Sequence, residues 1–136
     1  MSKMKTDYDP IEMKIADLKP RMKRLKVTFK VIEKGDTREV TIRRDDSNHH
    51  IADAVVADET GYVVMPLWDE MIDEVEVGNT YTLSNGYTGT FRGSLRLNIG
   101  KYGKITDAEE EIGEVSLEND VSETAGEPHY YRGKGT

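Results

Sequence analysis

The chain of 136 residues has room for one ordinary domain, and its 7% aromatic and 36% hydrophobic content indicates a small core with polar ends. It contains no cysteine, which excludes disulfide frameworks, thiolate zinc sites and cysteine nucleophiles. No apolar run approaches the roughly 20 residues that a membrane span needs, and polar sequence follows the first methionine where a secretory signal would be apolar. We therefore expect a cytoplasmic protein with no membrane partner.

The net charge of −7 is unevenly distributed along the chain. Residues 17–44 carry ten Lys or Arg and four Asp or Glu, whereas residues 45–76 carry ten acidic residues and no basic one. Residues 77–105 carry four basic residues and no acidic one, and residues 106–136 carry nine acidic and two basic residues. Because the potential near a surface depends on local charge, a positive groove is compatible with the negative total.

The first elements are read from the apolar pattern in chain order. Residues 1–15 are weakly patterned, and we interpret them as a flexible N-terminal arm. Between residues 24 and 33 apolar and polar residues alternate, as in a strand with one buried face. The buried face holds four apolar residues: Leu25, Val27, Phe29 and Val31. The outer face holds three cations: Arg24, Lys26 and Lys30.

The following segments are interpreted as a short strand over 39–42 within a long turn-rich connection, and a second full strand over 50–57. Residues 58–61 predict a hairpin loop with Gly61 in the left-handed conformation, before a third strand over 62–68. Pro66 cannot donate a hydrogen bond to a neighbouring strand, so this strand should lie at an edge or be bulged there.

The second half of the predicted domain begins with one or two turns of helix over residues 69–77. Residues 80–87 and 94–101 predict the fourth and fifth strands, and residues 88–93 a flexible loop between them. After residue 105 the chain is rich in Asp and Glu and poor in large apolar residues, which predicts a disordered acidic tail over 106–136.

This order predicts an all-β domain over residues 16–105. Five short strands, with a short helix between the third and the fourth, match a five-stranded Greek-key OB barrel. Other small all-β barrels remain open on the pattern alone.

Trp68 is a candidate for a contact surface. A single tryptophan in a strand is more often part of the core, but Trp68 alternates away from Val63, Met65 and Leu67, which share the other face. A tryptophan on a solvated face exposes a large apolar plane, and such a plane usually marks a contact surface.

Tyr87 and Phe91 have an ambiguous direction. On unbroken strands each would share a face with apolar neighbours and point into the core. Gly86 and Gly93 each lie between the aromatic residue and its apolar run, and a glycine bulge there would turn the ring to the outer face. The pattern leaves core and ligand face equally open for both rings.

Cations lie on or beside the expected outer faces, namely Lys26 and Lys30 on the first strand and Arg92 and Arg96 near the fifth. An ordinary solvated face is the alternative explanation. Aromatic rings interleaved with cations suit single-stranded nucleic acid, because bases stack at about 1–3 kcal/mol per base and cations neutralise phosphates.

Other constellations are weak. His49 and His50 are adjacent and should point to opposite faces of a strand, so they do not easily chelate one metal. The four carboxylates within residues 69–74 are typical of a solvated helix face. The chain shows no nucleophile–base pairing, phosphate loop or nucleotide fingerprint. We expect no enzyme activity, no metal site and no cofactor.

Four short stretches carry a family resemblance when taken in their order and spacing. They read Ala-Asp-Leu-Lys-Pro-Arg-Met (16–22), Val-Ala-Asp-Glu-Thr-Gly (56–61), Leu-Trp-Asp (67–69) and Gly-Tyr-Thr-Gly-Thr-Phe-Arg-Gly (86–93). Over about residues 15–105 the chain resembles archaeal single-stranded DNA-binding proteins, and it is similar to the human single-strand-binding subunits of the SOSS complex.

The resemblance implies an OB fold that binds single-stranded DNA with little sequence preference, in replication, repair or recombination and in association with the nucleoid. It implies that Trp68, Tyr87 and Phe91 stack on bases. Asn98 stands where human-type members carry another aromatic residue, and it is a candidate for a hydrogen bond to a base or a sugar. Family tails recruit partner proteins, which points to the aromatic and basic residues of 129–134.

Two alternatives remain open. One is an OB protein that binds single-stranded RNA, since stacking platforms accept either polymer. The other is a protein-interaction OB module whose exposed aromatic residues dock a peptide. In the DNA-binding interpretation the acidic tail is expected to compete with DNA for the groove or to dock a partner protein.

Overall fold

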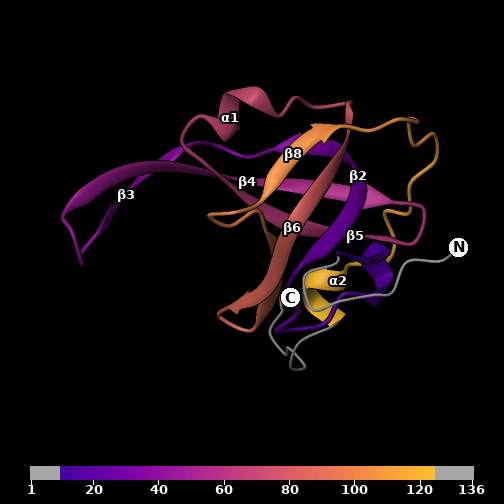
Figure 1. Cartoon of the computed structure of the whole chain (residues 1–136), viewed down its shortest axis with the longest axis horizontal. Coiled ribbons are helices and arrows are strands. Elements are labelled where there is room, and N and C mark those ends of the chain that lie inside the picture. Colours follow the sequence, from indigo (N-terminus) through magenta and orange to yellow (C-terminus); the bar gives the residue numbers. More distant parts are fainter. Residues whose placement is uncertain (1–9, 125–136) are drawn as a thin grey trace, which may run out of the picture.

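A computed structural model describes residues 10–124 of the chain (Figure 1). Its elements, in chain order, are β1 (Ile11–Glu12), the 3₁₀ helix η1 (Ile15–Asp17), β2 (Leu25–Lys34), β3 (Arg38–Ile42), β4 (Ser47–Asp58), β5 (Gly61–Trp68), α1 (Met71–Glu74), β6 (Thr80–Phe91), β7 (Ser94–Asn98), β8 (Lys104–Asp107) and α2 (Val121–Thr124).

The five predicted strands form the barrel. Around it the order is β2, β4, β5, β7 and β6, and β6 pairs back with β2. The ring is nearly open between β5 and β7, where the register has a single parallel pair, Val64 with Arg96. The short helix α1 lies between the third and fourth of these strands. The predicted OB architecture is confirmed.

The barrel interior follows the period-two pattern of the strands. Leu25, Val27 and Phe29 are fully buried on the inner face of β2, and Met65 and Leu67 are fully buried on β5. Alternation places these side chains on one face of each strand, and their burial from water supplies the main driving force for closing the barrel. The inward faces predicted from the sequence are confirmed.

Two segments extend the sheet beyond the barrel. The β3 strand pairs with the first half of β4, and together they form an arm that projects from one side of the barrel (Figure 1). The β8 strand pairs with the first half of β6, on the other side of β6 from β2. The paired residues run from Tyr81 with Asp107 to Ser84 with Lys104. The short β3 strand was predicted from the sequence, whereas β8 was not.

The structure places the N-terminal segment against the barrel from residue 10 onward. The β1 strand pairs in parallel with the start of β2. Ile15 is fully buried, and its backbone N–H donates to Asp58 Oδ2 at 2.9 Å. This contact uses a carboxylate from a distant hairpin, so it is not visible in the local pattern. Residues 1–9 lie outside the described residues.

The structure also describes the first part of the chain after residue 105. Residues 108–124, which we call the C-terminal strap, run back along the barrel and end in α2 beside β5. Val121 is 2% exposed, and the backbone N–H of Val64 donates to Ser122 Oγ at 3.0 Å. Few apolar residues hold the strap, which is why composition alone suggests disorder. Residues 125–136 lie outside the described residues.

Two local expectations for turns are wrong. Gly61 does not adopt a left-handed conformation but begins β5, where a Cβ atom would lie 2.9 Å from the carbonyl oxygen of Asn119 in the strap. Residues 88–91 are not a flexible loop, because β6 continues to Phe91 and Thr88 is 4% exposed. The backbone N–H of Thr88 donates to the carbonyl of Met22 at 3.0 Å, which ties this part of β6 to the chain before β2.

Candidate nucleic-acid interface

A bulge in β6 decides the direction of Tyr87. Leu25 pairs with Gly86 but Val27 pairs with Leu83, so three steps along β6 oppose two steps along β2. The extra residue is accommodated at Asn85, whose φ of 60° lies in the left-handed region. Beyond it the buried positions change parity, and Tyr87 is 43% exposed. Of the two directions that the sequence left open for Tyr87, the bulge near Gly86 gives the outer one, whereas the β6–β7 register has no bulge at Gly93, which lies in the turn.

Gly86 is required at this bulge for reasons of space. A Cβ atom on Gly86 would lie 2.5 Å from Leu83 Cδ2 and 3.1 Å from the carbonyl oxygen of Asn98. The backbone of β6 therefore approaches the core and β7 more closely than any other residue permits. The glycine that the sequence analysis singled out acts by letting the strand bend, while Asn85 takes the unusual backbone angle.

The hairpin of β6 and β7 presents one continuous outer face. Tyr87 lies opposite Asn98, and Phe91 lies opposite Ser94. The turn is made by Arg92 and Gly93, with φ of 55° and 81°, a pair of positive angles typical of a type I′ hairpin turn. Phe91 is 54% exposed, so its ring is available for contact.

Two guanidinium groups cover the ring of Phe91. Arg92 lies 5.2 Å and Arg96 lies 5.5 Å from the ring centroid. At this distance the ring quadrupole attracts a cation, and the contact holds each charge beside the aromatic plane. The structure thus brings together Phe91 and the two arginines that the sequence analysis assigned to phosphate contacts.

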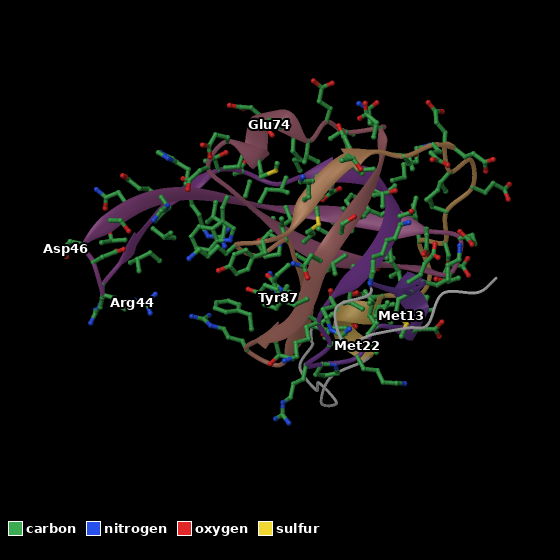
Figure 2. All side chains as sticks on the ribbon, viewed as in Figure 1. Met13, Met22, Arg44, Asp46, Glu74 and Tyr87 are labelled. Carbon is green, nitrogen blue, oxygen red and sulfur yellow. The ribbon has the colours of Figure 1, made fainter. Side chains whose placement is uncertain are left out.

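Trp68 lies at the end of β5, on the outer face, and is 40% exposed. A hollow of about 300 Å³ lies beside it, lined by seven residues: Pro66, Trp68, Met71, Tyr87, Asn98, Ile99 and Gly100. Two of the three predicted stacking rings and the predicted polar residue Asn98 therefore line one cavity. Figure 2 shows Tyr87 on the same side of the barrel as the β3–β4 arm, whose tip carries Arg44 and Asp46.

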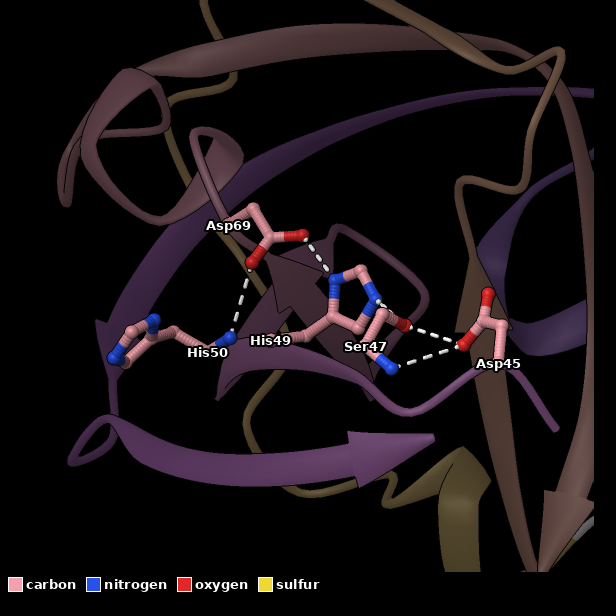
Figure 3. Close-up of polar contacts among 5 residues, drawn as sticks. All are labelled: Asp45, Ser47, His49, His50 and Asp69. Atoms are coloured by element: carbon pink, nitrogen blue, oxygen red, sulfur yellow. Dashed lines mark hydrogen bonds and ion pairs between the residues drawn. The ribbon is translucent and has the colours of Figure 1, made fainter. Parts of the chain in front are cut away.

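His49 is a residue of this face that the sequence analysis missed. Its ring meets Trp68 edge-on, with centroids 5.7 Å apart and planes at 74°. Nδ1 of His49 shares a hydrogen bond with Asp69 Oδ2 at 2.8 Å, and Nε2 shares one with Ser47 Oγ at 2.9 Å (Figure 3). The imidazole is thereby fixed at both nitrogens beside the indole.

Asp69 anchors this network. Its Oδ1 accepts the backbone N–H of His50 at 3.0 Å, and this bond, followed by the contact with His49, lowers the pKa of the carboxyl below its ordinary value. Asp69 comes directly after Trp68 and has a φ of 53°, so a backbone turn brings its carboxylate back to β4. The contact joins residues 20 positions apart, which local patterns do not reveal.

An acidic residue lies among the cations of the same face. Asp53 on β4 has its Oδ2 3.6 Å from Arg96 Nη1 and 3.7 Å from Arg38 Nη1. Its Oδ1 is buried and, within residues 10–124, accepts no hydrogen bond. Arg38 extends the cationic set onto β3, in the connection from which the sequence analysis drew no site residue.

Lys26 lies elsewhere. It lines a hollow of about 580 Å³ together with Lys14 and six acidic residues of β1, β8, the strap and the β4–β5 turn: Glu12, Glu59, Asp107, Glu109, Glu110 and Glu111. This hollow shares no lining residue with the one beside Trp68. Its negative surroundings make it a poor site for a phosphate.

Lys30 is placed on the outer face of β2, where it pairs with Ala57 of β4. Trp68 pairs with Ile51, which lies on the same strand β4 six residues before Ala57. Six residues correspond to about 20 Å along a strand. Neither lysine is thus among the residues that the structure gathers around Trp68, Tyr87 and Phe91.

Two negative findings concern residues 10–124. No helix there is long and apolar enough to cross a membrane. Nor does that part of the chain bring together three or more His, Asp or Glu side chains in a way that would hold a metal ion.

Comparison with known proteins identifies the family. The model of the family "Single-stranded DNA binding protein Ssb-like, OB fold" matches residues 18–107. The single-stranded DNA-binding protein Ssb of Saccharolobus solfataricus is 33% identical over 101 residues, which cover 74% of this chain and 67% of that protein. An uncharacterised protein of Arabidopsis thaliana is 29% identical over 104 residues, covering 71% and 68% of the two chains.

Solved structures agree on the fold. A hypothetical protein from Arabidopsis thaliana superposes with a TM-score of 0.73 at 26% identity, covering 98% of this chain and 97% of that one. The second OB-fold domain of replication protein A from Methanococcus maripaludis gives a TM-score of 0.59 at 22% identity, covering 76% and 100%. This chain belongs to the Ssb-like family of OB-fold single-stranded DNA-binding proteins, a family of non-catalytic proteins, as its sequence motifs predict.

Proposed function

We propose that this protein binds single-stranded DNA with little sequence preference, through base stacking on Trp68, Tyr87 and Phe91. Arg92, Arg96 and Arg38 contact the phosphates, and Asn98 donates or accepts a hydrogen bond at a base or a sugar. In this role the protein coats exposed single strands during replication, repair or recombination, in association with the nucleoid.

One observation carries the proposal. Trp68, Tyr87 and Asn98 line the same hollow on the outer face, and Phe91 follows on the same hairpin under two guanidinium groups. Exposed aromatic planes are costly to leave in water, and here they are grouped beside cations. A strand of nucleic acid matches both properties, since each nucleotide offers a π-face and a phosphate.

Sequence tolerance follows from the kind of contact. Every base has a face that stacks on an aromatic ring, whereas base-specific recognition needs several directed hydrogen bonds. Among the residues of 10–124 that line the hollow beside Trp68, Asn98 alone carries a side-chain amide. One amide at a flexible single strand discriminates weakly between bases.

The test uses the protein's single tryptophan as its own reporter. Titration with oligo-dT should quench Trp68 fluorescence, and binding should weaken as salt is raised because phosphate contacts release counterions. Replacement of Tyr87 by Ala should weaken binding by about 1–3 kcal/mol, or roughly 5- to 150-fold. Leu117→Ala is a matched control, because Leu117 is also exposed, at 53%, but lies in the strap.

Two outcomes would contradict the proposal. No quenching by oligo-dT, or quenching that does not depend on salt, would favour a protein-interaction module. A parallel titration with oligo-U separates DNA from RNA, and tighter binding of oligo-U would assign the site to RNA. Trp68→Ala, followed by anisotropy of a labelled oligonucleotide, should weaken binding without unfolding the domain, because the ring is 40% exposed and lies on the outer face.

A further inference from the structure

The connection between β7 and β8 carries another aromatic side chain beside the proposed binding face. Tyr102 is 75% exposed, which is more than Trp68, Tyr87 or Phe91. A lysine accompanies it, since Lys101 Nζ lies 5.6 Å from the ring centroid. The pairing of an exposed ring with a cation repeats the arrangement of Phe91 and its arginines.

Tyr102 lies next to the hollow that contains Tyr87. Gly100 lines that hollow and packs so closely on Tyr87 that a Cβ atom would lie 2.9 Å from Tyr87 Cε1. Tyr102 follows Gly100 by two residues, so their Cα atoms are at most about 7.6 Å apart. The backbone of Tyr102 therefore lies close to the residue that packs on the ring of Tyr87.

Residues on either side of Tyr102 tie the β7–β8 turn to β6. Asn85, the residue at the β6 bulge, donates from Nδ2 to the carbonyl of Tyr102 at 3.4 Å. The preceding Gly100 has a φ of 79°, which bends the chain around Tyr87. Figure 1 shows this connection on the same side of the barrel as the β3–β4 arm and the β6–β7 hairpin.

We propose that Tyr102 is a fourth stacking position, which takes the nucleotide beyond the one on Tyr87, with Lys101 at its phosphate. This inference rests on the proposed function and extends it. The nucleic-acid path then continues from the β6–β7 hairpin past Tyr87 to the β7–β8 turn, and short oligonucleotides occupy only part of it.

A length series of oligo-dT tests the inference, with Trp68 fluorescence as the readout. For a twelve-nucleotide strand, Tyr102→Ala should weaken binding by roughly 5- to 150-fold, the effect of losing one stacked base. For the shortest strand that still quenches Trp68, the same variant should bind as the wild type does. Tyr102→Phe should keep wild-type affinity at every length, because the π-face is retained.

Lys101 provides an independent readout. Lys101→Gln should reduce the slope of log affinity against log salt by about 0.7 for the longer strand, the value for one phosphate contact on single strands. Leu117→Ala again serves as the control for removal of an exposed apolar side chain.

The inference is overturned if Tyr102→Ala binds the longer strand within twofold of the wild type. It is also overturned if the variant weakens all lengths equally, since Tyr102 would then not lie beyond Tyr87. These results differ from failure of the proposed function, in which the wild-type protein itself would show no salt-dependent quenching.

Discussion

Asp53 places a negative charge in the middle of a surface proposed to bind a polyanion, and its removal makes a quantitative prediction. The carboxylate lies between Arg38 and Arg96, at 3.7 and 3.6 Å. A phosphate that takes either arginine must first break its contact with Asp53. We therefore expect Asp53→Asn to bind single-stranded DNA more tightly than the wild type does.

The size of the gain follows from the two ion pairs. Partly exposed pairs of this kind contribute about 0.2–1 kcal/mol each, so removing both obstacles strengthens binding by about 0.4–2 kcal/mol, or roughly 2- to 30-fold. Each arginine that gains a phosphate should also steepen the salt dependence by about 0.7 in log–log slope. When salt is raised from 50 to 200 mM, one additional phosphate contact corresponds to an additional loss of affinity for single-stranded DNA of about 2.6-fold.

Fluorescence titration with oligo-dT at several salt concentrations measures both quantities. Asp107→Asn is the matched control, because it removes the same charge on β8, at the hollow that contains Lys26. Asp53→Glu, which keeps the charge, should stay close to the wild type. Equal or weaker binding by Asp53→Asn with an unchanged salt slope would refute the reasoning, as would an equal gain in Asp107→Asn.

Two further predictions concern stability. Gly86→Ala should lower the free energy of unfolding by about 1–3 kcal/mol in urea titrations, because its Cβ would lie 2.5 Å from Leu83 Cδ2; unchanged stability would mean that the bulge is not tight. Asp120→Asn should raise the unfolding temperature at neutral pH, because burial, with help from Glu123, raises the pKa of Asp120 and so disfavours its charged form in the folded state. The asparagine can still accept the N–H of Ser122. The gain in unfolding temperature should vanish below pH 3.8, the ordinary pKa of the carboxyl, because the aspartate is then protonated in both the folded and the unfolded state. A gain that persists below this pH would contradict this explanation.

The barrel was predictable because its inner faces obey a simple period. Leu25, Val27 and Phe29 alternate with polar residues, and burial of such a face requires only that the strand lie on a core. The direction of Tyr87 was not predictable to the same degree, because it depends on one extra residue in β6. Gly86 suggested a bulge, but only the register shows that Asn85 absorbs it.

Features made by long-range polar contacts were missed. The hydrogen bonds of His49 depend on a turn at Asp69 that brings its carboxylate back to β4. Two adjacent histidines on a strand give no sign of this contact in the sequence. The strap is held by the buried Val121 and by hydrogen bonds to the edge of β5, to Asp58 at the end of β4 and to Thr80 of β6. Acidic composition is a good predictor of disorder on average, but it does not count such contacts.

The strap covers backbone groups on one edge of β5. The backbone N–H groups of Tyr62 and Val64 point away from β4, and the strap satisfies them through the carbonyl of Asn119 and the hydroxyl of Ser122. The next residue of β5 that faces this edge is Pro66, which has no backbone N–H. A proline at a strand edge is the arrangement that the sequence predicted. An uncovered edge is a template for pairing with a second chain. Since the strap follows every barrel strand in the sequence, it emerges from the ribosome after them, and this edge of β5 stays uncovered until residues 119–122 have emerged.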